Sequence, residues 1–394
     1  MALINLIALL LFVTCMVTVL YSLFFSIAGH FYRIKKYDNK NQFKKIAVFM
    51  PAYKEDEVIL NTAKHALLQN YPSHRYDVFV IADSLRDETL QELKKLPIQL
   101  FPVSFEKSTK SKAINAAFNQ IKTQYDLAVI LDADNIMHID FLDRVNAAAV
   151  SGCYAIQGHR MAKNKNTRYA ILDAISEEVN NHIMRKGQIA VGLSSSVIGS
   201  GMAFSYLYLK QVMSEIDAVG GFDKELEMTL IDDNHQIVYL EDAIVLDEKV
   251  QKSEVFVNQR TRWVAAQMVY LKKYWMRGIY NLLRGRIDYA NKVMHYALVP
   301  KVILLGTLLF MFLTNLIIPS IQPGPSLWIA LAFTYFLAYA IAIPRNYWNK
   351  DMLQAIISLP KTVWVMCKAM LNIKGANKQF IHTPHTAHFE KTTI

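Results

Sequence analysis

No charged side chain occurs between Ala2 and Ala28, and this run constrains the fold more than any other feature of the chain. A helix of about 20 apolar residues crosses the hydrocarbon core of a bilayer, so the run is long enough to span it. A signal peptide would begin with basic residues and end at a small-residue cleavage site, and the run has neither. We therefore expect residues 1–30 to form a transmembrane helix.

Basic residues follow this run and predict its orientation. They are Arg33, Lys35, Lys36, Lys40, Lys44 and Lys45. Because positive charge beside a span tends to stay cytoplasmic, we expect a multi-pass protein of the cell inner (plasma) membrane with its middle part in the cytoplasm. The three scattered cysteines have no metal-binding or redox spacing, which fits a reducing compartment.

The formal net charge of +10 raises the hypothesis of a nucleic-acid partner. The basic residues, however, crowd the segments that flank the predicted membrane regions. Anionic lipid headgroups or an anionic nucleotide substrate explain such a distribution better, so we expect membrane lipids as partners and no nucleic acid.

The last third of the chain predicts further membrane contact. Residues 264–300 have an amphipathic, basic pattern that suits interfacial helices in the headgroup layer, and a surface helix of the soluble domain is the alternative. Residues 302–321 and 327–343 are apolar enough for two further spans, which we place within 301–345.

Residues 346–394 contain an apolar stretch that charged residues and a proline interrupt. The stretch 352–373 is apolar, but Pro360, Lys361 and Lys368 interrupt it. We expect a re-entrant or interfacial segment there rather than a fourth span, followed by a cytosolic tail.

Between the membrane segments, residues 31–263 alternate short apolar strands with helices. The strands are expected at 45–50, 77–81, 98–103 and 126–131, with a lysine-rich loop at 107–112 and a helix from Ala113. This order predicts an α/β fold with a parallel, Rossmann-like sheet. Such sheets bind ligands beyond the carboxyl ends of their strands.

Two carboxylates, Asp132 and Asp134, follow the fourth predicted strand. Residues two apart in a strand point to the same face, so both acids would lie together at the tip of the sheet. Mg²⁺ or Mn²⁺ accepts such ligands, often only one or two carboxylates with phosphate oxygens. The alternative is a turn with two solvated acids.

The other strand ends also carry polar side chains of the kind that a nucleotide needs. Tyr53 and Glu55 follow the first strand, Asp83 the second, and Lys110 the third. The chain contains neither G-x-G-x-x-G nor G-x-x-x-x-G-K-[ST], so no dinucleotide fold or phosphate-loop ATPase is indicated. A diphosphate bound without those loops needs a metal and lysines instead.

These motifs together resemble membrane-bound family 2 glycosyltransferases of the GT-A fold, the group of the cellulose, chitin and hyaluronan synthases. Residues 51–55 (PAYKE) resemble the family's P-A-Y-N-E, and residues 110–115 (KSKAIN) are similar to G-K-x-x-A-L-N. Gln259, Arg262 and Trp263 match Q-x-x-R-W. The ordered set makes the resemblance specific.

The resemblance implies a nucleotide-sugar donor, expected to be a UDP-sugar, with Mg²⁺ or Mn²⁺ as cofactor. Asp132 and Asp134 match the metal-binding D-x-D. In the same way Tyr53, Glu55 and Asp83 would hold the nucleoside.

Further roles are implied on the diphosphate side. Lys110 would assist the diphosphate, and Gln259, Arg262 and Trp263 would close over it and over the acceptor terminus. Trp263 would offer a flat face to a sugar ring, and an interfacial anchor is its alternative role.

The family's general base follows a T-E-D motif from which this chain departs. The register gives Asp223-Lys224-Glu225, so Glu225 takes the base position. A glutamate can serve, because displacement with inversion needs a carboxylate within hydrogen-bond reach of the acceptor hydroxyl. Glu227 on the same predicted helix is the rival, and the pair Glu241-Asp242, which follows a predicted strand, ranks third.

Histidines in the tail are a last candidate for the metal shell. They are His382, His385 and His388, and a solvated tail is the alternative.

We therefore expect an inverting, metal-dependent transferase that moves a sugar to a glycan or lipid-linked acceptor at the cytoplasmic membrane face. A processive polysaccharide synthase is one version, although so few spans would need a homo-oligomer or an export partner to enclose a hydrophilic chain. A non-catalytic membrane scaffold that retains the nucleotide-binding fold is the alternative, motivated by Lys224 in the base motif.

Overall fold

The computed structural model describes residues 1–218 and 220–371. The described chain divides into two compact units. Within the described residues, the helical unit comprises residues 1–32, 166–192 and 250–371, and the sheet unit comprises residues 33–165 and 193–249. Segments far apart in the sequence therefore build each unit.

The sheet unit is organised on a sheet that has eight strands in the described chain, in the order β3-β2-β1-β4-β7-β6-β8-β5. Their bounds are β1 Ile46–Tyr53, β2 Tyr76–Asp83, β3 Gln99–Val103, β4 Leu127–Ile130, β5 Ile136–Met137, β6 Ala155–Ala162, β7 Met202–Ser205 and β8 Ile237–Asp247. β1 pairs in parallel with β2 and β4, and β2 pairs in parallel with β3. The parallel sheet that the sequence predicts is thus confirmed for the first four strands.

Beyond β4 the sheet is mixed, and the sequence pattern of the first four strands did not predict this change of direction. β7 runs antiparallel to both β4 and β6, and β5 runs antiparallel to β8. The reason is local: Gly199 and Gly201 have positive φ angles of 81° and 60°, and β7 starts beside Ile130, at the carboxyl end of β4. The chain therefore re-enters the sheet from its carboxyl edge.

Successive side chains of β1 point to opposite faces of the sheet, and the two faces pack against different kinds of side chain. One face carries Ile46, Val48 and Met50, which belong to an aliphatic cluster with side chains of α2 (Asp56–Ala66) and α5 (Phe141–Val150). The other face carries Phe49, whose ring centroid lies 5.5 Å from that of Phe79 and 4.8 Å from that of Phe118 on α4 (Lys110–Gln120). Both faces are thus covered, which leaves the carboxyl edge for ligands.

The helix α4 starts earlier than the sequence pattern predicts. The Thr109 side chain accepts a hydrogen bond from the Lys112 backbone N–H at 3.2 Å, which is an N-cap. Lys110 therefore lies in the first turn of a helix rather than in the loop that we expected.

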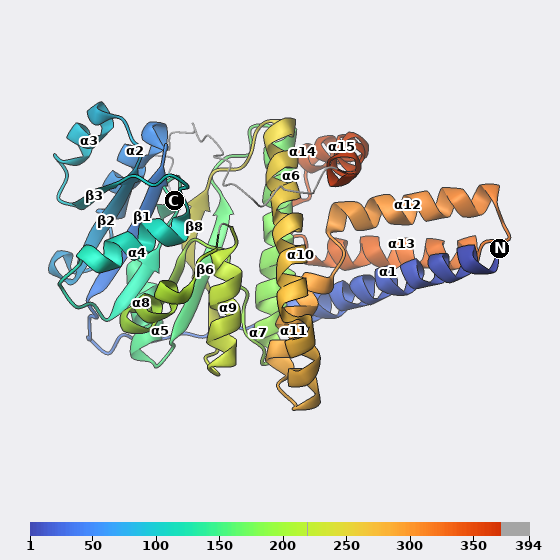
Figure 1. Cartoon of the computed structure of the whole chain (residues 1–394), viewed down its shortest axis with the longest axis horizontal. Helices are drawn as coiled ribbons and strands as arrows, with labels where there is room; N and C mark the ends of the chain where they lie inside the picture. The colour runs from blue at the N-terminus through green and yellow to red at the C-terminus, as the bar shows by residue number, and fades with distance from the viewer. Residues whose placement is uncertain (219, 372–394) are drawn as a thin grey trace. The chain divides into compact units, whose positions relative to one another are not determined.

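Three helices of the helical unit occupy the ranges that the sequence predicts as spans. α1 (Ala2–Gly29) and α13 (Pro325–Ala342) are each long and apolar enough to cross a membrane. α12 (Lys301–Ile317) reaches that length only together with α11 (Ile287–Ala297), from which it is bent by 58°. Within this unit α1, α12 and α13 lie side by side (Figure 1), and the ring of Phe12 meets that of Trp328 edge-on at 5.0 Å.

A buried network of charges lies elsewhere in the helical unit. On α6 (Arg168–Asn181), Asp173 pairs with Arg260, and Glu177 lies 3.6 Å from the Arg185 guanidinium. The Lys301 ammonium donates to the Asn180 side chain at 2.7 Å. These contacts join α6 to α10 (Ser253–Leu283) and to α12.

The amphipathic pattern near residue 264 belongs to α10, which packs against α11. Its buried residues include Tyr270, Tyr274 and Gly278, whereas the opposite face of the helix is apolar and exposed. The segment expected to be re-entrant or interfacial forms α14 (Lys350–Ile357) and α15 (Leu359–Leu371), with Ser358 between them. α8 (Tyr206–Glu215) and α9 (Phe222–Asp232) complete the helices that border the candidate site.

Candidate active site

The ends of β1 and β2 bring two predicted nucleotide-binding residues to adjacent positions. Tyr53 and Asp83 are register partners in the parallel ladder, and the Lys54 N–H donates to the Asp83 carbonyl at 3.1 Å. Glu55 is the N-cap residue of α2 and is 9% exposed. The Asp83 carboxylate is buried and accepts a hydrogen bond from the Ser84 hydroxyl at 3.0 Å. These residues therefore line one rim, as parallel strands require.

Asp132 and Asp134 lie in a turn rather than in a strand. β4 ends at Ile130, and the Asn135 N–H donates to the Asp132 carbonyl at 3.0 Å to close the turn. The Asp132 N–H donates to the Ser200 hydroxyl at 2.9 Å. The turn is thus held from both sides, and strand alternation does not govern the direction of its side chains.

Lys110 contacts Asp132 directly. Its ammonium donates to the Asp132 carboxylate and, at 2.5 Å, to the Gly199 carbonyl. It also lies 5.4 Å from the ring centroid of Phe222. The Lys110 and Asp132 side chains are 21% and 34% exposed, so this pair is reachable from solvent.

Asp134 has a different environment from Asp132. It is 4% exposed, and its Oδ2 accepts hydrogen bonds from the Asn135 side chain and from the Glu248 N–H, both at 3.1 Å. Burial lowers the pKa of the nearby Lys163 ammonium, while Asp134, Glu248 and Asp247 offset part of that shift. Asp134 is therefore fixed by the fold before any ligand binds.

The loop before β7 supports this turn through the side chains of Ser200 and Gln157. The Ser200 hydroxyl donates to the Asn135 side chain at 2.5 Å. The fully buried Gln157 donates to the Ser200 and Gly201 carbonyls at 3.1 and 3.2 Å and accepts from the Ile198 N–H at 3.0 Å. Gly199 and Gly201, which flank Ser200, already indicate in the sequence that another group lies close to the backbone there.

The acids present fit a divalent cation that is shared with a ligand. In the described ranges no cluster of three or more His, Cys, Asp or Glu side chains could hold a metal ion. Asp132 and Asp134 are the two carboxylates of the turn after β4, and Mg²⁺ or Mn²⁺ is often bound by two carboxylates with phosphate and water. His382, His385 and His388 lie outside the described residues.

The carboxylates of α9 differ in position. If residue 199 had a Cβ atom, it would lie 3.9 Å from the carboxyl carbon of Asp223, so Asp223 lies next to the loop that Lys110 contacts. Glu225 is partly exposed. Glu227 is 4% exposed and accepts a hydrogen bond from the Val197 N–H at 3.2 Å. Asp223 was not among our candidates for the base.

Gln259, Arg262 and Trp263 lie on α10 in the helical unit. Burial lowers the pKa of the Arg262 guanidinium. Trp263 is 43% exposed, and the Arg260 guanidinium lies 4.4 Å from the centroid of its ring system. Their predicted role over the diphosphate stays a prediction.

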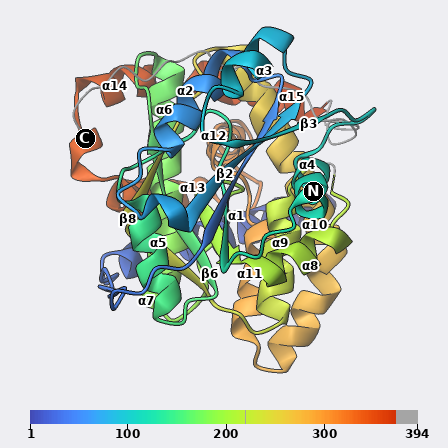
Figure 2. The same cartoon turned by 90° about the vertical axis from the view of Figure 1, so that its left-hand side faces the viewer.

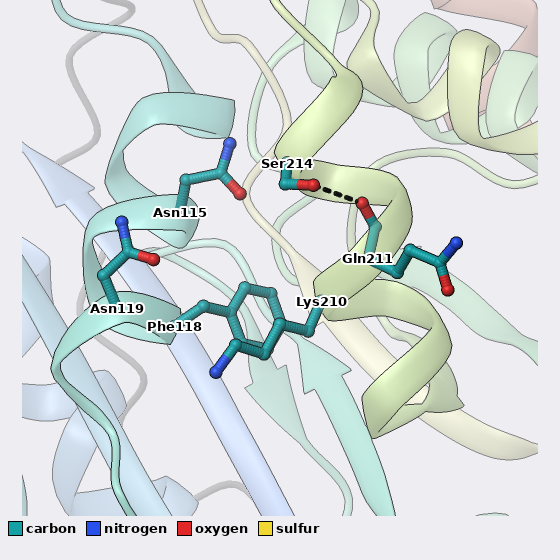
Figure 3. Close-up of a pocket in the computed structure, with 6 residues that line it drawn as sticks. All are labelled: Asn115, Phe118, Asn119, Lys210, Gln211 and Ser214. Atoms are coloured by element: carbon teal, nitrogen blue, oxygen red, sulfur yellow. Dashed lines mark hydrogen bonds between the residues drawn. The ribbon is translucent and has the colours of Figure 1, made fainter.

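A hollow of about 380 Å³ lies between α4 and α8, away from the strand ends. These helices lie side by side (Figure 2). Figure 3 shows the side chains around the hollow, which are Asn115, Phe118, Asn119, Lys210, Gln211 and Ser214. The Asn115 amide donates to the Met213 carbonyl at 2.7 Å, so part of this polar lining ties the two helices together.

The sheet unit is an α/β fold with a mixed sheet and with acids at the carboxyl ends of its parallel strands, and comparison with known proteins identifies its class. The model of the family described as "Glycosyltransferase like family 2" matches residues 44–266, more than half of the 394-residue chain. The chain belongs to this family. The predicted resemblance to GT-A glycosyltransferases of family 2 is thus confirmed. The resemblance to the cellulose, chitin and hyaluronan synthase subgroup is not confirmed.

Individual relatives are distant. The chain is 22% identical over 267 residues to the probable glycosyltransferase YdaM of Bacillus subtilis, covering 64% of this chain and 61% of the relative. It is 24% identical over 247 residues to the beta-monoglucosyldiacylglycerol synthase of Synechocystis, covering 59% and 50%. The chain thus spans less than two thirds of either relative.

One solved structure resembles the whole fold. It is the mannosyltransferase PcManGT of Pyrobaculum calidifontis in complex with GDP-Man and Mn²⁺, with a TM-score of 0.60 and 15% identity. The likeness covers 93% of this chain and 99% of that one. At this identity it supports the GT-A-like fold alone.

The burial of Glu227 leads to a prediction about stability. We expect Glu227→Ala to lower the free energy of unfolding by about 1–3 kcal/mol, because the buried Val197 N–H loses its acceptor. Glu227→Gln keeps an acceptor oxygen and serves as the control with a smaller loss. Thermal and denaturant unfolding of the purified protein in detergent measures both, and equal stability of Glu227→Ala and wild type would contradict the assignment.

Proposed function

We propose that this protein is a metal-dependent, inverting glycosyltransferase that moves a sugar from a nucleotide-sugar donor to a glycan or lipid-linked acceptor at the cytoplasmic membrane face. The observation that carries the proposal is the position of Lys110 and Asp132 together at the rim where the parallel strands end. An ammonium and a carboxylate at this edge suit a diphosphate and its cation. The family match supports the reaction class.

In this proposal the strand ends bind the nucleoside. Tyr53, Glu55 and Asp83 offer a ring and two carboxylates that can accept hydrogen bonds from the base and ribose. Their positions at adjacent ends of β1 and β2 support this role. UDP is the expected nucleotide.

The diphosphate would lie over the start of α4. Asp132 and Asp134 would hold Mg²⁺ or Mn²⁺, which neutralises the charge of the departing nucleoside diphosphate. Lys110 adds a flexible positive charge, and Gln259, Arg262 and Trp263 of α10 would cover the diphosphate and the acceptor.

A carboxylate on α9 would take the proton of the acceptor hydroxyl while that oxygen attacks the anomeric carbon. The sequence register favours Glu225. The approach of Asp223 to Gly199 supports Asp223 instead, since Gly199 is bound by the same ammonium that binds Asp132. Glu227 is less suited, because it already accepts a backbone hydrogen bond.

Turnover should depend on the cation-binding acid. We expect Asp134→Asn to lower nucleoside diphosphate release by at least about a hundredfold, because a neutral amide is a poor ligand for a hard cation. The fold should survive, since an asparagine oxygen can accept the two N–H groups now bound to Oδ2. The assay uses purified protein, Mn²⁺ and a panel of UDP- and GDP-sugars, with Asp87→Asn on α3 (Asp87–Leu93) as control.

Retained activity in Asp134→Asn would remove the metal-site proposal. No nucleoside diphosphate release by the wild type with any donor and acceptor would favour the scaffold alternative. No finding in the described chain supports that alternative.

The base can be identified by comparing isosteric variants. We expect Asp223→Asn to lower kcat by about a hundredfold or more, the usual contribution of a general base, and Glu225→Gln to lower it less. Steady-state rates with a saturating donor measure this difference. The reverse order of losses would assign the base to Glu225, as the sequence register predicts.

The acceptor is proposed to be reached at the membrane surface. The name of the Synechocystis relative, a monoglucosyldiacylglycerol synthase, supports a lipid acceptor. A secreted hydrophilic polymer would need an enclosed path, and the described chain offers two or at most three candidate spans. We therefore favour a single transfer over chain elongation, and the mass of the product decides between them.

The exposed face of α10 is proposed to lie in the headgroup layer. Met268, Trp275, Ile279 and Leu283 are each 46–84% exposed and recur at helical spacing. Lys272 lies on the same face, four residues after Met268, and Lys273, Arg277 and Arg284 lie along one side of it. Such a face binds anionic membrane surfaces, which suits an interfacial helix.

A spin label tests the depth of this face. A cysteine at Ile279, in protein otherwise free of cysteine and reconstituted in bilayers, should collide more often with oxygen than with a polar nickel chelate, because oxygen concentrates in the apolar layer. A label at the exposed Glu88 on α3 should show the opposite preference. Power-saturation EPR measures both, and matching preferences at the two sites would contradict an interfacial α10.

A further inference from the structure

The Lys110 ammonium already lies in the kind of oxygen environment that a hard cation takes. The Asp132 carboxylate and the Gly199 carbonyl both accept from it, and the face of Phe222 lies 5.4 Å away. Gly199 has a φ of +81°, a conformation that favours glycine and that shapes the loop carrying this carbonyl. Three groups from separate segments thus converge on one positive charge.

This arrangement disfavours a second cation at the same carboxylate. An ammonium and a divalent ion a few ångströms apart repel strongly, and the pair lies in a partly enclosed site where screening is reduced. Asp134 does not remove the need for Asp132, because its Oδ2 accepts two N–H groups and only part of its carboxylate would face the metal. Lys110 and a divalent metal therefore compete for Asp132.

A nucleoside diphosphate changes the balance of charges at this position. Its oxygens carry more negative charge than one carboxylate, and the lysine side chain is long and flexible enough to follow them. Lys110 starts from the first turn of α4, held by the Thr109 cap, so its backbone stays fixed while the ammonium moves.

We propose that Lys110 is a resident cation that occupies the Asp132 carboxylate until the donor diphosphate arrives, and that it then moves to the diphosphate and leaves Asp132 to a divalent metal. The inference rests on the proposed function. It makes Lys110 a positioning residue that couples metal binding to nucleotide binding. By linkage, nucleotide strengthens metal binding by the same factor that metal strengthens nucleotide binding.

The competition predicts how metal affinity responds to loss of the ammonium. In Lys110→Met, we expect Mn²⁺ alone to bind about tenfold more tightly than to the wild type, because Asp132 has no competing partner. The gain in Mn²⁺ affinity on adding UDP or GDP should be smaller than in the wild type, since there is no ammonium left to displace.

The experiment uses the full chain in detergent and counts free Mn²⁺ by its EPR signal, with and without UDP or GDP. Lys110→Arg keeps the charge and should keep the weak binding of Mn²⁺ alone. Lys112→Met is the matched control, because Lys112 lies on the same helix and its ammonium donates to the Lys107 carbonyl instead. It should bind Mn²⁺ alone as the wild type does. Thermal unfolding verifies that each variant is folded.

Two results would overturn the inference while leaving the proposed function in place. One is an unchanged affinity of folded Lys110→Met for Mn²⁺ alone, in a preparation whose wild type binds Mn²⁺ together with nucleotide. The other is a Lys110→Arg variant that behaves as Lys110→Met does. A wild type that binds neither UDP nor GDP in the presence of Mn²⁺ would instead overturn the proposed function, and the inference with it.

Discussion

The parallel pairing of β1 with β2 and β4 fixes the position of every candidate residue at the rim of the sheet unit. Because these strands end at one edge, Tyr53, Asp83 and the turn that carries Asp132 reach the same region. The register is enforced below that edge, since a slip by one residue would exchange the aliphatic and aromatic faces of β1. The chemistry at the rim therefore depends on packing inside the sheet.

Much of this arrangement could be predicted from the sequence, because it follows from local patterns. Apolar runs ending in polar residues indicated β1 to β4, and their order indicated a wound sheet. The strand order also predicted that Lys110 and Asp132 lie at the same edge of the sheet. In the structure the two side chains are in direct contact. The uncharged run near the N-terminus likewise indicated α1.

The rest depends on contacts between distant segments, which no local pattern encodes. Three features involve residues 193–249, which fold back onto the first strands. They are the antiparallel pairing of β7 with β4, the hydrogen bond from the Asp132 N–H to Ser200, and the burial of Glu227. The two halves of the Asp132-Asp134 pair look equivalent in sequence. In the structure one meets a lysine side chain and the other a backbone amide, so they are not interchangeable.

The buried charges of the helical unit carry a consequence for how the protein is made. Asp173 forms its ion pair with Arg260, which is translated 87 residues later. The Ser176 carbonyl accepts its hydrogen bond from Lys301, which is translated 125 residues later. Until Arg260 leaves the ribosome, the Asp173 carboxylate lacks this counter-charge and favours water over an apolar interior. Closure of this unit around α6 is therefore a late event in biosynthesis, and a chain cut short before α10 would keep this part of α6 hydrated and accessible to proteases.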